Sequence, residues 1–219
     1  MCLEYAPVRH TGWEARQGLG RIMKKRIILL LMAVVMSVLL AACGSAGEES
    51  GEEVSNPLEP DRHHVEITIK DYGKISLELY KEVAPITVEN FLKLAEDGFY
   101  DGLTFHRIIE GFMMQGGASE DVEAETIKGE FAKNGVTNEL SHTRGAISMA
   151  RTNVYDSANS QFFIVHQDSV FLDGEYACFG YVTEGMDVVD AVCEAAEEAD
   201  NGMIAREDQP VIESVVVID

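Results

Sequence analysis

A single arginine lies in an apolar and aromatic stretch of this 219-residue chain. The stretch, residues 104–117, reads TFHRIIEGFMMQGG; it contains Arg107, and Gln115 follows eight residues later, before two glycines. A guanidinium is costly to remove from water unless its N–H donors are engaged, so this placement indicates a surface that binds a ligand. The segment alone leaves open a routine ion pair at the end of a strand.

A second segment favours the binding surface over the ion pair. Residues 145–151 read GAISMAR, and the motif QFFI, with Gln161 and Phe163, begins ten residues later. The motif FLDG at 171–174 and the pair FG at 179–180 come next. Several motifs that occur together in one order are far more specific than the arginine alone.

The motifs of covalent, phosphate or metal chemistry are absent from the sequence. It has no GxSxG elbow, no P-loop, no GxGxxG after a strand and no HExxH. We interpret His63 and His64 as solvated side chains. The acidic residues at 184–208 lack the ligand spacing of a calcium loop, and we interpret them as a solvated face. We therefore expect neither a metal nor a cofactor.

The motifs closely resemble those of the cyclophilin-type peptidyl-prolyl cis-trans isomerases. The family signature F-x-R-x-x-x-x-F-M-x-Q-G-G is met at every fixed position from Phe105 to Gly117, and the resemblance covers residues 65–219. It implies a mainly β fold, an eight-stranded antiparallel β-barrel capped by two α-helices. It also implies an outer groove that binds X-Pro segments.

Matching by motif extends the resemblance to single residues. Arg107 takes the place of the family's catalytic arginine. The positions that form the proline pocket are Phe112, Met113, Phe163 and Leu172. The positions that line the groove for the substrate backbone are Gln115, Ala150, Arg151 and Gln161.

Three positions depart from many members of that family. Phe171 stands in place of Trp and cannot donate the indole hydrogen bond, so we expect weakened cyclosporin binding. Tyr176 stands in place of His; this side chain borders the pocket without transferring a proton, so the change should alter substrate preference more than the reaction. Arg151 stands in place of Asn, and we keep it in the site because the backbone makes much of the contact there.

Hydrophobic periodicity predicts the elements that position these residues. Residues 65–69 and 75–79 alternate apolar and polar side chains on either side of a turn, which indicates a hairpin. A helix follows, with Thr87 as its predicted cap and Gly98 at its end. Further strands are expected at 103–109, 146–150, 161–165, 177–182 and 211–218, and a second helix at 186–196. Periodicity alone indicates a barrel or sandwich with helices over its open ends.

Charge and composition restrict the class of function. The net charge of -21 and a pI of about 4.5 exclude a cationic nucleic-acid binder. From Cys43 onward, 11 basic and 36 acidic side chains leave a net charge of -25. With 46% apolar residues, the chain can bury a core. We favour free buried thiols at Cys178 and Cys193 over a bridge.

The first sixty residues resemble a secretion signal and a tether. Three cations precede a 16-residue apolar run at 27–42, which is short of the ~20 residues that span a membrane. The sequence LAAC that ends at Cys43 resembles the bacterial lipobox, which implies a lipid on that cysteine. An ordinary signal peptide or an uncleaved anchor is the alternative. We divide the chain into an upstream extension or misassigned start (1–22), a lipoprotein signal peptide (23–42), a flexible acidic tether (43–61) and the isomerase domain (62–219).

The predicted function is that of a foldase outside the cytoplasm. We expect a monomer, held by the lipid at the bacterial cell membrane, that acts on proline-containing unfolded or secreted polypeptides. The alternative is a proline-segment binding or chaperone module with little turnover. A solute-binding lipoprotein is disfavoured, because the alternating strand-helix pattern of such two-lobed proteins is not seen.

Overall fold

The structure is a computed structural model and describes residues 61–197 and 199–219. The predicted signal peptide, Cys43 and the tether up to residue 60 lie outside the described residues. Within the described part, no helix combines the length and the apolar character needed to cross a membrane.

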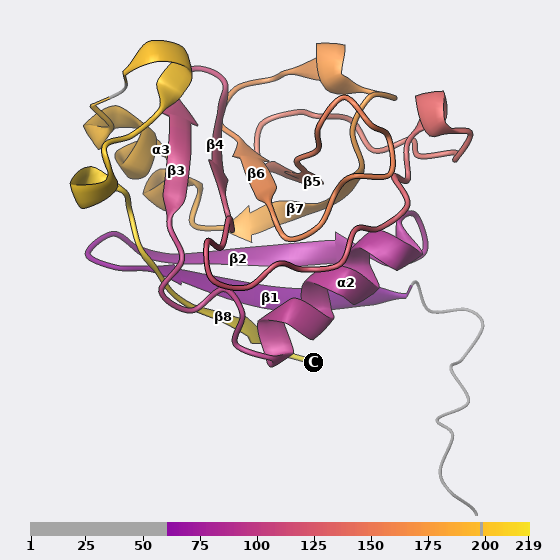
Figure 1. Cartoon of the computed structure of the whole chain (residues 1–219), viewed down its shortest axis with the longest axis horizontal. Coiled ribbons are helices and arrows are strands. Elements are labelled where there is room, and N and C mark those ends of the chain that lie inside the picture. The colour runs from indigo at the N-terminus through magenta and orange to yellow at the C-terminus, as the bar shows by residue number, and fades with distance from the viewer. Residues whose placement is uncertain (1–60, 198) are drawn as a thin grey trace, which may run out of the picture. The chain divides into compact units, whose positions relative to one another are not determined.

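The domain is built on one antiparallel sheet of eight strands in the order β3-β4-β6-β5-β7-β2-β1-β8 (Figure 1). The strands are β1 (Arg62–Ile69), β2 (Gly73–Tyr80), β3 (Phe105–Ile109), β4 (Met113–Gly116), β5 (Ala146–Met149), β6 (Phe162–Val165), β7 (Cys178–Glu184) and β8 (Ile212–Val217). The sheet curls into a half-barrel. The outer strands β3 and β8 touch only near their first residues among those described, where the Phe105 N–H donates to the Pro210 carbonyl (2.9 Å) and the Ile212 N–H to the Leu103 carbonyl (2.8 Å). The expected eight-stranded fold is confirmed.

The two α-helices are short and lie against the sheet: α2 (Pro85–Glu96) and α3 (Met186–Ala195) (Figure 1). The described residues also form four 3-10 turns, η1 (Ala132–Asn134), η2 (Val170–Leu172), η3 (Asp200–Gly202) and η4 (Arg206–Asp208). Helix α2 packs on β8 and β2, and α3 packs on β2 and β4.

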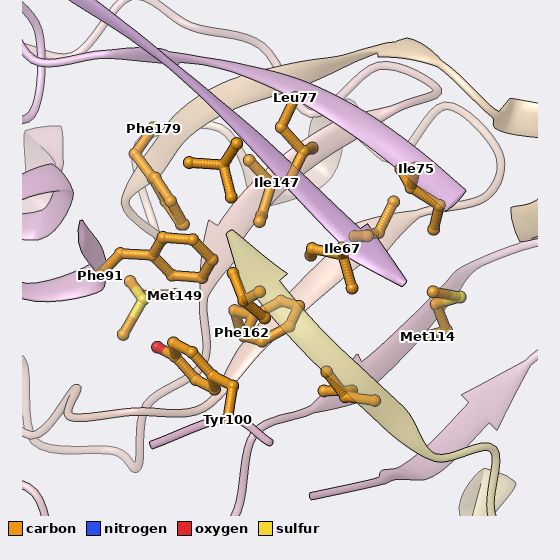
Figure 2. Close-up of a cluster of buried hydrophobic side chains, with 14 of the residues drawn as sticks. Ile67, Ile75, Leu77, Phe91, Tyr100, Met114, Ile147, Met149, Phe162 and Phe179 are labelled. Carbon is orange, nitrogen blue, oxygen red and sulfur yellow. The ribbon is translucent and has the colours of Figure 1, made fainter. Parts of the chain in front are cut away.

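The core lies between the inner face of the sheet and α2 (Figure 2). Phe91 of α2 meets three aromatic rings from the rest of the domain, with centroid distances of 5.1 Å to Tyr100, 5.5 Å to Phe162 and 5.4 Å to Phe179. Full burial of such side chains contributes about 1.5–3 kcal/mol each. The predicted helix is therefore held mainly by its apolar face.

Strand β4 was not indicated by periodicity. It pairs with β3 on one side and β6 on the other. Met113 and Met114 are both buried, because one faces the outer groove and the other the core. A strand covered on both faces has no alternating pattern. At Gly116, a Cβ would lie 2.8 Å from the Thr104 carbonyl, so only glycine fits here.

The prediction that Thr87 caps α2 is wrong. The helix begins at Pro85, which suits the first helical position because its missing N–H has no helical partner there. Thr87 lies inside the first turn and is buried. The carboxylate of Glu130 accepts the Ile86 N–H (3.2 Å), the Thr87 N–H (2.8 Å) and the Thr87 hydroxyl (2.7 Å). A residue from a distant loop therefore caps this helix. Gly98 adopts a φ of 68° just beyond its end, as predicted.

His63 and His64 belong to β1. The side chain of His64 is 55% exposed and that of His63 is 24% exposed. The interpretation as a solvated side chain therefore fits His64 but not His63. Both imidazoles lie within 4 Å of the Asp219 carboxylate. Among the described residues, no group of three or more His, Cys, Asp and Glu side chains is arranged to hold a metal ion.

The thiols of Cys178 and Cys193 are free and buried, as predicted. Burial raises the pKa of each thiol to about 12, so neither forms the reactive thiolate near neutral pH. We expect both to resist iodoacetamide in the native protein at about pH 8 and to react after denaturation. Peptide mass mapping of the alkylated sites checks this. Native alkylation at either position as fast as in urea would contradict it.

Candidate active site in the outer groove

Arg107 projects from β3 opposite Gln115 of β4. Its Nε donates to the Asn201 carbonyl (2.9 Å) and its Nη2 to the Asn201 Oδ1 (3.0 Å), while Nη1 lies 3.9 Å from the Met113 Sδ. Within the described ranges, the ion pairs do not include Arg107. The routine ion pair is therefore wrong for this arginine, whose orientation comes from neutral acceptors.

A pocket of about 270 Å³ opens beside the Arg107 guanidinium. Its lining residues are Arg107, Phe112, Met113, Gln115, Ala150, Arg151, Phe163, Leu172 and Tyr176. The pocket therefore combines an apolar floor with polar groups at its edge. Such a site can hold a small apolar ring while a positive charge faces the atoms next to it.

A second hollow of about 210 Å³ shares Gln115, Ala150 and Arg151 with this pocket and adds Gln161. The Gln115 Nε2 donates to the Gln161 Oε1 (3.0 Å), which orients both amides. The two hollows therefore adjoin and form one groove. Phe171 lies outside the lining, 70% exposed, with its ring 5.6 Å from that of Phe112 at the rim.

The Arg151 guanidinium forms part of the wall and does not reach freely into the groove. It lies over the rings of Phe131 (4.9 Å), Tyr155 (5.2 Å) and Tyr176 (4.7 Å). Its Nε and Nη2 donate to the Glu175 carbonyl at 3.0 and 2.8 Å. With these donors engaged, the side chain stiffens the groove through cation–π packing and leaves ligand contact to the backbone.

A buried polar chain that the sequence reasoning missed supports the pocket floor. The His142 Nδ1 lies 2.8 Å from the Asp173 Oδ1, and its Nε2 lies 3.0 Å from the Ser148 hydroxyl. The His142 ring stacks on Phe163 at 6.0 Å. Ser148 is fully buried, so this Ser-His-Asp chain has no access to a substrate. It ties β5 to the turn that carries Leu172.

Electrostatics keep this polar chain in one protonation state near neutral pH. Burial lowers the pKa of His142, and the Asp173 carboxylate offsets part of that effect. Burial alone would raise the pKa of Asp173, but hydrogen bonds from Ser141 and from His142 bring it below its usual value. A neutral imidazole therefore faces an ionised carboxylate.

The sequence patterns did not indicate Asn201 as a site residue, because it lies in the acidic segment that we interpreted as a solvated face. It adopts a φ of 61° in η3, and Gly202 follows with a φ of 79°. A Cβ on Gly202 would lie 2.7 Å from the Ile108 carbonyl, so glycine lets this turn approach β3. The Asn-Gly pair is a turn signal that could have drawn attention to the position.

Comparisons with known proteins agree on one family. A family model described as cyclophilin type peptidyl-prolyl cis-trans isomerase matches residues 64–217. Peptidyl-prolyl cis-trans isomerase B of Bacillus subtilis is 45% identical over 143 residues, which cover 64% of this chain and 92% of that protein. Peptidyl-prolyl cis-trans isomerase B of Escherichia coli is 40% identical over 158 residues, which cover 67% and 95%.

A solved structure shows the same architecture. The cyclophilin type peptidyl-prolyl cis-trans isomerase of Cryptosporidium parvum, crystallised in the presence of the dipeptide Ala-Pro, matches with a TM-score of 0.62 and 26% identity. The match covers 71% of this chain and 99% of that one. The fold and the named relatives define a peptidyl-prolyl cis-trans isomerase. The chain belongs to the cyclophilin-type peptidyl-prolyl cis-trans isomerase family.

Proposed function

We propose that this chain is a lipid-anchored foldase outside the cytoplasm, and that it accelerates rotation about X-Pro bonds by a non-covalent mechanism centred on Arg107. The observation that carries the mechanism is the position of the guanidinium at the edge of an apolar pocket. Asn201 engages two of the five N–H groups of a guanidinium and leaves the Nη1 side toward the pocket.

The chemical problem is one of rate. Rotation about a peptide bond faces a barrier of ~18–20 kcal/mol because the nitrogen lone pair is conjugated with the carbonyl. The cis and trans forms of X-Pro differ by only ~0.5–1 kcal/mol. Lowering the barrier by ~7 kcal/mol would speed exchange roughly 10⁵-fold. No covalent bond breaks, so the reaction needs no nucleophile.

The groove supplies two effects that suit this rotation. Met113, Phe163 and Leu172 hold the pyrrolidine ring while the carbonyl side turns. The Arg107 guanidinium donates toward the prolyl nitrogen, whose lone pair becomes available only when the bond twists. An interaction that is stronger in the transition state than in the ground state accelerates the reaction.

Turnover separates this function from a binding module that uses the same groove. In a protease-coupled assay with an X-Pro peptide, an isomerase shortens the slow phase that reports cis-to-trans conversion. We expect catalytic amounts of the protein to abolish that phase. An unchanged slow phase at a saturating concentration of the protein would show that the groove binds the peptide without catalysing its isomerisation.

The proposed location depends on Cys43 and the residues around it. The lipobox-like sequence LAAC and the acidic stretch that follows support a lipid anchor and a tether to a monomeric domain. We expect the native protein to partition into membranes, to begin at Cys43 and to carry a lipid mass. The Cys43→Ser variant should leave the membrane fraction. An intact mass that includes residues before Cys43 would overturn the processing scheme.

The exposed Phe171 supports a proposal about inhibitors. Its ring packs on Phe112 but has no N–H to donate. We infer that cyclosporin binds more weakly than it does to relatives with Trp at this position. The Phe171→Trp variant should bind cyclosporin more tightly than the unaltered chain, which calorimetry measures.

Asn201→Ala should lower turnover by releasing Arg107 from its fixed orientation. We expect kcat to fall about 3–10-fold, with a smaller change in KM, because the guanidinium acts on the twisted state. Exchange spectroscopy on an X-Pro peptide measures both. The exposed Asn153 provides a control, since Asn153→Ala alters no contact of Arg107. Equal kcat in the two variants would contradict the positioning role.

A further inference from the structure

A larger hollow, of about 570 Å³, lies beside the start of β3, outside the groove described above. Its lining residues are Gly102, Leu103, Thr104, His106, Ala118, Ser119, Glu120, Asp121, Met203, Arg206 and Gln209. We call it the side hollow. It shares no lining residue with the proline pocket, yet His106 directly precedes Arg107 in the chain. Nothing in the X-Pro rotation uses it.

Hydrogen bonds connect the polar groups in the walls of the side hollow. The Thr104 hydroxyl donates to the Gln209 Oε1 (2.5 Å), and the Gln209 Nε2 donates to the Ile204 carbonyl (3.0 Å). The Ser119 hydroxyl oxygen accepts the N–H of Asp121 (3.3 Å). The first two bonds attach the segment before β8 to the start of β3, and the third shapes the loop after β4.

The charge of the side hollow favours a cation. Glu120 and Asp121 bring two carboxylates, and Arg206 brings one guanidinium. Burial, and then the neighbouring Arg107 charge, lower the pKa of His106, so its imidazole adds no charge near neutral pH. The lining therefore keeps an excess negative charge, on a chain that is strongly acidic as a whole. In the described part of the chain, Asp121 has no ion-pair partner.

The ion pair between Glu120 and Arg206 at the side hollow can open easily. The Arg206 Nη1 lies 2.8 Å from both carboxylate oxygens of Glu120, and the two side chains are 78% and 77% exposed. Exposed pairs of this kind contribute little to stability because water and salt screen them. A second cation can therefore compete with Arg206 for Glu120.

The same backbone segment borders both sites. Asn201 holds the Arg107 guanidinium, and two residues later Met203 lines the side hollow. The Ile204 N–H donates to the His106 carbonyl (3.0 Å), which fixes this segment along β3. Residues 201–204 therefore connect the Arg107 side of the proline pocket with a wall of the side hollow.

We propose that the side hollow is a second subsite for the substrate polypeptide, which binds a lysine or arginine side chain a few residues from the X-Pro bond. Glu120 and Asp121 are its acceptors, and Arg206 competes with the substrate cation. The subsite makes cationic, proline-containing segments the favoured substrates. This proposal rests on the isomerase activity and is independent of the proposed lipid anchor.

The test compares kcat/KM of the full chain for an uncharged X-Pro peptide with that for peptides carrying one lysine. The lysine is moved through four positions on each side of the X-Pro bond. We expect a preference of about fivefold for lysine at one or two of these positions, lost when salt is raised to about 0.5 M. The uncharged peptide reports the basal activity separately, so a failure of turnover is not confused with a failure of the subsite.

Two variants that break the same ion pair should act in opposite directions. Glu120→Gln removes an acceptor and should lower the lysine preference at least about threefold, whereas Arg206→Gln removes the competitor and should raise it. Glu123→Gln is the control, because this acid lies in the same loop but does not line the side hollow. None of the three should change turnover of the uncharged peptide.

Two outcomes would overturn the subsite. The absence of a lysine preference at all eight positions shows that no cation binds near the substrate. A fall in preference of equal size in Glu120→Gln and Arg206→Gln shows that the ion pair only shapes the loop.

Discussion

Arg107→Ala is expected to lower kcat/KM for an X-Pro peptide by at least tenfold, while the domain remains folded. Removal of one transition-state donor commonly costs about 10²–10³ in rate. The guanidinium packs against Asn201 and Met113 at the edge of the groove, away from the main core, so its loss creates no core cavity. Exchange spectroscopy or the protease-coupled assay measures the rate, and circular dichroism checks the fold.

The Arg107→Lys variant separates the effect of charge from that of geometry. Lysine keeps the positive charge but lacks the planar guanidinium group. A lysine carries its three N–H donors on one nitrogen, so it cannot reproduce the planar arrangement in which Nε and Nη2 contact Asn201 while Nη1 faces the pocket. We expect this variant to recover only a small part of the lost activity. Near-normal turnover in Arg107→Ala would remove Arg107 from the mechanism, and full activity in Arg107→Lys would reduce its role to charge alone.

Glu130→Ala is expected to destabilise the domain by about 2–4 kcal/mol, the largest stability effect that we expect of a single polar side chain here. Glu130 is 3% exposed, and its carboxylate accepts hydrogen bonds from three donors at the start of α2. Its removal leaves two backbone N–H groups and the Thr87 hydroxyl without a partner, and takes a negative charge from the positive end of the helix. The unfolding midpoint should fall by roughly 5–12 °C in thermal melts.

Two matched variants separate the helix cap from a general charge effect. Glu130→Gln keeps the shape and one acceptor oxygen, so we expect a smaller loss of stability. Among the residues that the structure describes, the exposed Glu125 forms no side-chain hydrogen bond or ion pair, and Glu125→Ala should leave the midpoint unchanged within about 1–2 °C. A Glu130→Ala midpoint equal to that of Glu125→Ala would show that α2 does not depend on this carboxylate.

Local patterns predict the elements that have one solvent face. The hairpin β1–β2 alternates strictly because its outer face meets water, and its register pairs Val65 with Leu77 and Ile67 with Ile75. The face of α2 that carries Phe91 follows the helical period for the same reason. Strand β4 breaks this rule, since core and groove cover its two faces and erase the alternation.

Motif matching predicted the groove more completely than periodicity did. The structure brings Arg107, the pocket residues and the groove residues together, and places Phe171 at the rim. Motifs did not indicate Asn201 or His142, which touch the site from segments without an apolar pattern. A polar side chain in a loop acquires its role only from what the fold sets beside it.

By itself, the sequence determined the acidic character of the chain, most of the strands, both helices and the family to which the domain belongs. These follow from composition, from local periods and from motifs that lie close together in the chain. Only the tertiary structure decided that Glu130 caps α2 from 43 residues away, that Asn201 orients Arg107 from 94 residues away, and that the side hollow forms beside β3. The physical reason is that hydrogen bonds and charges act over a few ångströms in space, whatever the separation along the chain.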